Sequence, residues 1–120
     1  LMRRNLSETE IIRKKQDIDR IFRQGTAVSC KGMRLAFIEN TCHFDRFIII
    51  PAKHYGNAVE RNKLRRRCKE LFRLYPGRIL SGAASENEKC HDIALVVYPG
   101  KVLSYSLLES KFYGLLDRIR

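Results

Sequence analysis

The chain has 120 residues, with 24 Lys and Arg against 13 Asp and Glu, and its formal net charge is +11. This charge favours nucleic acid as the partner, with an anionic membrane surface as the competing partner, and a hydrophobic content of 44% excludes a disordered basic tail. One domain over residues 1–120 is expected, and no apolar run approaches the roughly 20 residues that a membrane-spanning helix needs.

Nothing in the sequence indicates export from the cell. Residues 1–5 carry charge, but no apolar segment follows them, so no secretory signal is visible. Cys30, Cys42, Cys68 and Cys90 lack the close C-x-x-C pairs of zinc sites, and no feature implies an oxidising compartment. We therefore expect reduced, structural cysteines, no metal site and a cytoplasmic location.

The first half of the chain predicts one helix followed by three strands. Ser7–Glu10 has the form of a capping box, and the helical spacing of Ile18, Ile21 and Phe22 predicts a helix over about residues 15–24 that ends at Gly25. Alternating and apolar runs then predict strands over residues 26–30, 33–39 and 46–51, with a turn at 40–44.

The second half predicts a helix, a strand and a helix. The longest helix is expected over residues 57–74, before the terminator Pro76-Gly77, and residues 77–90 are expected to form a mobile surface loop. The apolar run 92–98 predicts a central strand, and apolar residues at three- and four-residue steps predict a helix over about 104–118. The order α-β-β-β-α-β-α gives an α+β fold, a mixed α/β sandwich with a four-stranded sheet and three helices.

The helix expected over residues 57–74 separates apolar from basic side chains. Helical periodicity places five apolar residues on one stripe that we expect to be core: Leu64, Cys68, Leu71, Phe72 and Tyr75. A broad polar side carries Asn62, Arg65, Arg66, Lys69 and Arg73. A helix that is basic only for solubility would mix both signs of charge, whereas its acidic residues are only Glu60 and Glu70. The polar side is therefore expected to bind a polyanion.

Three segments carry a resemblance to a known family. Gly56-Asn57-Ala58-Val59-x-Arg61-Asn62-Lys63-Leu64-Arg65-Arg66 resembles the signature helix of the bacterial ribonuclease P protein subunit. Lys14-Lys15-x-Asp17-Ile18-x-x-Ile21-Phe22-x-x-Gly25 is similar to that family's first helix, and Asp92 to Gly100 is similar to its last strand. The order of elements agrees across roughly residues 11–118.

The resemblance implies a function that composition does not show. Members of the family bind a large catalytic RNA, and the complex removes the 5′ leader from precursor transfer RNA. The RNA carries out the hydrolysis with bound Mg²⁺, so the resemblance implies no catalytic residue in this chain, and no protein partner and no membrane are predicted. It also implies a left-handed βαβ crossover, against the general preference for right-handed crossovers.

The resemblance further implies the residues of two binding surfaces. The catalytic RNA is expected at Lys53, His54, Asn57, Arg61, Asn62, Lys63, Arg65, Arg66, Lys69 and Arg73. Arg61 lies nearest the apolar stripe, so part of its role is expected to be structural. The 5′ leader is expected in a cleft between the first helix and the sheet, at Ile18, Phe22 and Ala36.

The expected leader-binding cleft departs from the family pattern. Phe22 matches an aromatic residue of the cleft, but Ile18 replaces a Phe, and Ala36 stands where a strand aromatic is usual, with Phe37 on the opposite face. Tyr98 stands where the family often has Arg. Weaker or differently distributed stacking on the leader is therefore expected, with the alternative that Ile18 and Phe22 are simply core.

Two functions of other classes remain open. The first is a free-standing RNA-binding, RNA-chaperone or ribosome-associated module without a role in cleavage. The second is a stand-alone nuclease, which the sequence supports least, because its aspartates form no evident metal-binding cluster: Asp17, Asp19, Asp45 and Asp92. Restoration of precursor cleavage to the family's catalytic RNA at low Mg²⁺ separates the ribonuclease P role from the first alternative.

Overall fold

The computed structural model describes residues 8–80, 88–100 and 104–119. Its elements in chain order are the 3-10 helix η1 (Glu8–Glu10), α1 (Lys15–Gln24), β1 (Thr26–Cys30), β2 (Met33–Glu39), β3 (Arg46–Pro51), α2 (Ala58–Leu74), β4 (His91–Val97) and α3 (Tyr105–Asp117). The expected α+β class and order of elements are confirmed, and η1 is added before α1. Ser7 of the expected capping box and residues 81–87 of the expected mobile loop lie outside the described residues.

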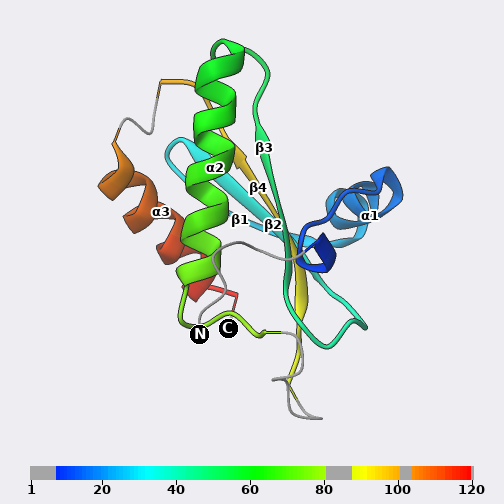
Figure 1. Ribbon diagram of the computed structural model, residues 1–120. Helices are drawn as coiled ribbons and strands as arrows, with labels where there is room; N and C mark the ends of the chain where they lie inside the picture. The colour runs from blue at the N-terminus through cyan, green and yellow to red at the C-terminus, as the bar shows by residue number, and fades with distance from the viewer. Residues whose placement is uncertain (1–7, 81–87, 101–103, 120) are drawn as a thin grey trace.

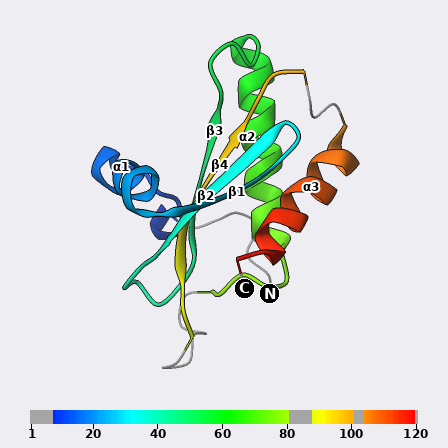
Figure 2. The ribbon, with the colours of Figure 1, turned by 180° about the vertical axis from the view of Figure 1, so that it is seen from behind.

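The strands form one sheet in the order β1-β2-β4-β3. β4 is central, as its continuous apolar sequence predicted, and the structure pairs it antiparallel with β2 and parallel with β3. Helices α2 and α3 cover one face of the sheet, and α1 lies on the other face (Figures 1 and 2). Each face therefore has its own hydrophobic cluster.

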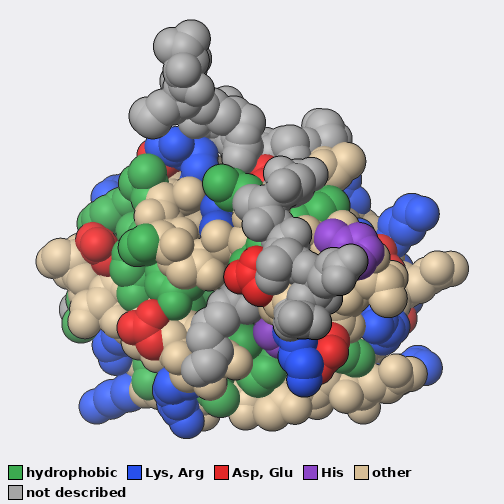
Figure 3. Space-filling view, turned by 90° about the horizontal axis from the view of Figure 1, so that it is seen from below, with side chains coloured by type: hydrophobic (Ala, Val, Ile, Leu, Met, Phe, Trp, Pro, Cys, Tyr) green, Lys and Arg blue, Asp and Glu red, His purple; other side chains and the backbone are tan. Residues whose placement is uncertain are grey.

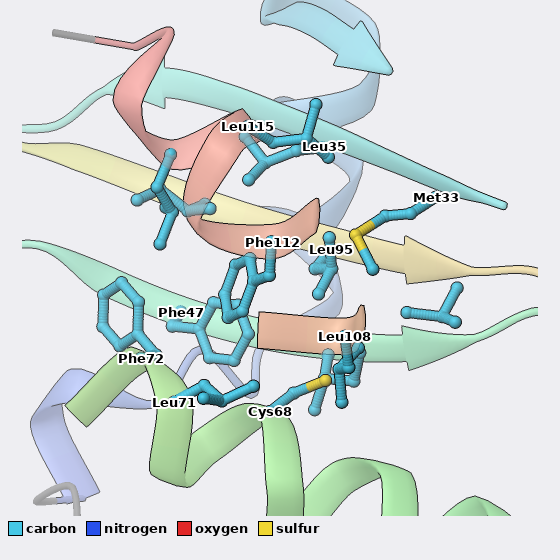
Figure 4. Packing of buried hydrophobic residues seen from close by; sticks show 14 of the residues in the cluster. Met33, Leu35, Phe47, Cys68, Leu71, Phe72, Leu95, Leu108, Phe112 and Leu115 are labelled. Atoms are coloured by element: carbon cyan, nitrogen blue, oxygen red, sulfur yellow. The ribbon is translucent and has the colours of Figure 1, made fainter. Parts of the chain in front are cut away.

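The connection from β3 through α2 to β4 is left-handed. The two strands are adjacent and parallel, so the chain between them has to cross a face of the sheet. Seen from the side of α2 and α3, both strands point to the right and β4 lies above β3 (Figure 4). About 98% of such crossovers have the opposite hand. The left-handed crossover that the family resemblance implied is therefore confirmed.

The larger cluster joins α2 and α3 to the sheet. All five residues of the expected apolar stripe of α2 are buried in it. An aromatic stack forms its centre, because the ring of Phe47 lies 4.6 Å from that of Phe72 on α2 and 5.5 Å from that of Phe112 on α3 (Figure 4). Phe47 of β3 thus packs against both helices at once.

The start of α2 is defined by a reciprocal capping box. The side chain of Asn57 accepts a hydrogen bond from the backbone N–H of Glu60, and the carboxylate of Glu60 accepts one from the N–H of Asn57. Gly56 precedes the cap with φ of +147°, and a Cβ there would lie 2.5 Å from Oε1 of Glu60. Glycine is therefore required at this position.

The capping box yields a stability prediction. Asn57→Ala removes the cap and is expected to lower the free energy of unfolding by about 0.5–2 kcal/mol. Asn57→Asp keeps an oxygen acceptor at the positive end of the helix and is expected to retain stability. Urea unfolding of both variants checks this, and an equal loss in the two would contradict the capping role.

Thiol reactivity tests the packing beneath α2. All four cysteines are reduced thiols, Cys68 and Cys90 are buried, and burial raises the pKa of the Cys68 thiol to about 12. Because the thiolate is the reactive form, an alkylating reagent at pH 8 is expected to label half-buried Cys30 and Cys42 first. Cys68 is expected to react slower by on the order of 10³-fold or more, since labelling requires opening of the core. Equal rates for Cys68 and Cys42 in the native protein, with denatured protein as the reference, would refute this placement.

Candidate nucleic-acid interface

The polar side of α2 borders a groove with a volume of about 390 Å³. Ile11 forms its other wall, because the chain after η1 bridges to β3 at Phe47 and the N–H of Ile12 donates to the Phe47 carbonyl at 2.9 Å. The groove therefore follows the outer edge of β3. We call it the basic groove, and its described lining residues are Ile11, Asn62, Arg65, Arg66, Lys69, Glu70 and Arg73.

The basic groove brings together half of the RNA-binding residues expected from sequence. Two of its arginines already have partners on α2: Arg65 donates to the Asn62 side-chain oxygen at 3.1 Å, and Arg73 donates to Glu70. The hydrogen bond from Arg73 lowers the pKa of Glu70, so this carboxylate is ionised at neutral pH. The positive charge is therefore strongest at Arg65, Arg66 and Lys69. Helix periodicity could not reveal Ile11, which comes from another segment.

Arg61 has the structural role expected from its place beside the apolar stripe. Its guanidinium donates to the carbonyl of Ala52 at 3.1 Å and to that of Pro51 at 3.4 Å, and the side chain is half-buried. These carbonyls lie where the chain leaves the sheet at the end of β3. Arg61 thus ties the end of β3 to the first turns of α2 and lies outside the basic groove.

The other expected RNA-binding residues surround the start of α2. Lys53 and His54 are exposed in the turn between β3 and α2, and Asn57 is the helix cap. Lys63 lines a separate hollow of about 350 Å³ beside Tyr55. Arg67, on the same flank of the helix, lies over the ring of Tyr105 at 5.6 Å and links α2 to α3.

Basic side chains are not confined to α2. Seen from the end of the molecule where α2 ends, Lys and Arg side chains lie around the rim, with hydrophobic side chains gathered on the side of α2 and α3 (Figure 3). Net charge alone therefore does not define the interface. The basic groove is distinguished by gathering four cationic side chains beside one carboxylate, whereas the hollow along α1 gathers three, Lys15, Arg20 and Arg23.

The face of the sheet beneath α1 is built from three rows of residues that run across the strands. The anchor row is Ile38, Asp92 and Arg46; the alanine row is Ala27, Ala36, Ala94 and Ile48; the open row is Ser29, Arg34, Val96 and Ile50. α1 lies on the alanine row, where its Ile18 and Ile21 pack against Ala36 and Ala94.

No helix in the described part of the chain covers the open row, because β3 and β4 extend beyond α1 (Figure 1). Ser29 and Arg34 are exposed there, and Val96 and Ile50 are half-buried. The open row therefore presents a mixed apolar and basic surface beside α1.

The residues expected in a leader-binding cleft fall into two groups. Ala36 is only 2% exposed beneath α1, and Ile18 packs in the same cluster, so both belong to the core, as the alternative for Ile18 held. Phe22 is 39% exposed and is not core. Helical spacing puts it on the flank of α1 opposite Asp17, toward the open row. The sequence did not single out Arg34, which the register alone places on this surface.

Two buried carboxylates near the start of β3 and β4 are already engaged by protein donors. Asp92 accepts hydrogen bonds from Arg46 and Asn40, and Asp45 accepts them from the N–H groups of Ile79 and His91. Within the described residues, no group of three His, Cys, Asp or Glu side chains is placed to hold a metal ion. Nor does any helix in those residues have the length and hydropathy to span a membrane.

Comparison with known proteins identifies the family. The family model Ribonuclease P matches residues 6–120. The ribonuclease P protein component of Borreliella burgdorferi is 31% identical over 121 residues, covering 98% of this chain and 92% of that protein, and the one from Alkaliphilus metalliredigens is 26% identical over 110 residues, covering 91% and 92%. The solved structure of the ribonuclease P protein from Thermotoga maritima superimposes with a TM-score of 0.75 at 26% identity, covering 92% of this chain and 98% of that chain. The chain therefore belongs to the ribonuclease P protein family and has the role of a ribonuclease P subunit.

Proposed function

We propose that this subunit binds the catalytic RNA of ribonuclease P along the basic groove and binds the 5′ leader of precursor transfer RNA beside α1. In this role it assists the endonucleolytic removal of the leader in the cytoplasm, with no further protein partner. The observation that carries the proposal is the convergence of Arg65, Arg66 and Lys69 on one hollow at the edge of β3.

The chemistry of the basic groove suits a folded RNA. Guanidinium groups donate paired hydrogen bonds to phosphate oxygens, and an ammonium group adds a mobile point charge. The amide of Asn62, whose oxygen accepts from Arg65, keeps its N–H donors available for a phosphate or a 2′-hydroxyl. The groove is open along α2, so it can follow a phosphate backbone rather than enclose a small anion.

The surface beside α1 suits a single strand. Phe22 offers an exposed ring, Val96 and Ile50 offer an apolar floor, and Arg34 offers a cation for phosphate. Stacking of a base on an aromatic ring contributes about 1–3 kcal/mol and tolerates any base. This fits a partner whose leader sequence varies from one precursor to the next.

The hydrolysis itself is assigned to the RNA. Mg²⁺ bound mainly by that RNA would supply the activated water and stabilise the leaving oxygen. Asp17, Asp45 and Asp92 already pair with Arg46 or accept backbone hydrogen bonds, which supports placing the metal on the RNA rather than on this chain. The protein contributes positive charge and orientation.

Reconstitution tests the proposal directly. The purified protein, added to the catalytic RNA from the same organism at low Mg²⁺, is expected to restore cleavage of precursor transfer RNA, because its cations offset repulsion between the two RNAs. RNA binding without restored cleavage would instead favour a free-standing RNA-binding module.

Charge reversal tests the basic groove. Arg65→Glu/Arg66→Glu is expected to weaken binding of the catalytic RNA by roughly 10²-fold or more, because two charge-assisted hydrogen-bonding groups are removed. The slope of log affinity against log salt should fall by about 0.7–0.9 for each phosphate that the variant no longer neutralises. The melting temperature should stay near that of the wild type, since neither side chain is buried. Filter binding across a salt series and a thermal melt supply the measurements.

A matched control uses the opposite edge of the sheet. Lys31→Glu/Arg118→Glu makes the same change in charge near β1, which lies across the sheet from β3. This variant is expected to keep most of the RNA affinity and the salt slope. If it weakens binding as much as the groove variant, only the net charge matters and the groove assignment fails.

A further inference from the structure

A polar network fastens one flank of α1 to the sheet. Asp92 is fully buried, and Arg46 donates two hydrogen bonds to it, from Nε to Oδ1 at 2.8 Å and from Nη2 to Oδ2 at 2.6 Å. Asn40 donates a third at 2.8 Å. The carboxylate is therefore held by groups from two other segments before α1 is considered.

Two side chains of α1 reach this network from successive turns. Asp17 lies 3.7 Å from Nη2 of Arg46, and Nη1 of Arg20 lies 3.9 Å from Oδ2 of Asp92. Arg20 also donates to the carbonyl of Glu39 at 3.2 Å. We call Asp17 and Arg20 the helix anchor. The helix anchor contacts Arg46 and Asp92 of the anchor row, on the flank of α1 opposite Phe22.

α1 is also attached at both ends, on the N-terminal side through Ile12, whose N–H donates to the Phe47 carbonyl at 2.9 Å, and on the C-terminal side through Gly25. Gly25 continues directly into β1, and a Cβ at this residue would lie 2.4 Å from the Ile21 carbonyl oxygen and 2.5 Å from that of Phe37. Between its ends, the contacts of α1 with the alanine row are apolar: Ile18 and Ile21 pack on Ala36 and Ala94. Without the helix anchor, only these apolar contacts would set the rotation of α1 about its own axis, and with it the position of Phe22.

We propose that Asp17 and Arg20 are positioning residues for the leader: by fastening α1 to Asp92 and Arg46, they hold Phe22 at a fixed height over the open row. The proposal rests on the proposed function, because it assumes that the leader lies on this surface. No residue of the network lines the basic groove, although Asp17 and Arg46 line a neighbouring hollow with Ile11, and the network lies on the flank of α1 opposite Phe22. Its effect is therefore confined to the part of substrate affinity that depends on the leader.

The test compares precursor with mature transfer RNA on the reconstituted holoenzyme. Asp17→Asn/Arg20→Gln breaks the helix anchor without changing the net charge and leaves the buried Arg46–Asp92 pair intact. The gain in affinity that the leader confers is expected to fall by about 5- to 20-fold, the range of one weakened base stack. Affinity for the catalytic RNA and for mature transfer RNA should not change. Phe22→Ala is expected to lose the same leader-dependent gain.

Two controls separate positioning from charge and from stability. Asp19→Asn/Arg23→Gln makes the same substitutions on the same helix, at side chains that are not part of the network, and should keep the leader-dependent gain. Glu10→Gln weakens the other buried ion pair, with Arg78 at 2.8 Å, and should lower the melting temperature while keeping that gain. Equal losses in either control, or a parallel loss of affinity for the catalytic RNA, would overturn the positioning role.

Failure of the positioning role and failure of the proposed function give different results. If the wild-type holoenzyme shows a leader-dependent gain that Asp17→Asn/Arg20→Gln leaves intact, the inference is wrong and the proposed function stands. If the wild type shows no such gain, the leader-binding surface and the inference are wrong together. Rescue of the gain by Arg20→Lys in place of Arg20→Gln would further support an ionic anchor.

Discussion

The parallel pairing of β3 with β4 is the constraint on which the other features depend. Parallel neighbours cannot be joined by a tight turn, so the chain between them crosses one face of the sheet as α2. That helix packs along β3, the edge strand, which leaves its polar side at the margin of the sheet rather than over its middle. The basic groove lies along the outer side of β3, and the open row ends at Ile50 of the same strand. The two surfaces therefore lie on opposite faces of the sheet and meet at its β3 edge.

The basic residues of α2 are divided among different tasks. Arg61 donates to a backbone carbonyl just after β3, Arg67 packs on an aromatic ring of α3, and Arg73 is paired with a carboxylate. Arg65, Arg66 and Lys69 of the basic groove, and Lys63 outside it, remain for an external anion. The number of phosphates that this helix can neutralise is therefore smaller than its formal charge suggests, and a variant at Arg61 would report on folding more than on RNA binding.

The elements of this fold could be predicted from local sequence because their signals are local. The stripe from Leu64 to Tyr75 follows the helical period, and the strand patterns follow from apolar runs and turn residues. The handedness of the crossover was available only through family resemblance. The helix anchor and the Glu10–Arg78 pair could not be foreseen, since their partners lie far apart in the chain and no periodic pattern relates them. The same reason explains Ala36: its place beneath α1 depends on the register of three strands, not on its neighbours.

The alternation of Ala36 and Phe37 has a consequence for how this protein tolerates changes in chain length. Phe37 packs in the larger cluster, whereas Ala36 admits α1 close to the sheet. A one-residue deletion early in β2 would exchange their faces, placing a benzyl group under α1 and leaving a void in the opposite core. A single deletion would therefore disrupt the packing on both faces of the sheet. Insertions and deletions should therefore be excluded from β2 by two independent packing requirements, even where each side chain could be substituted with modest effect.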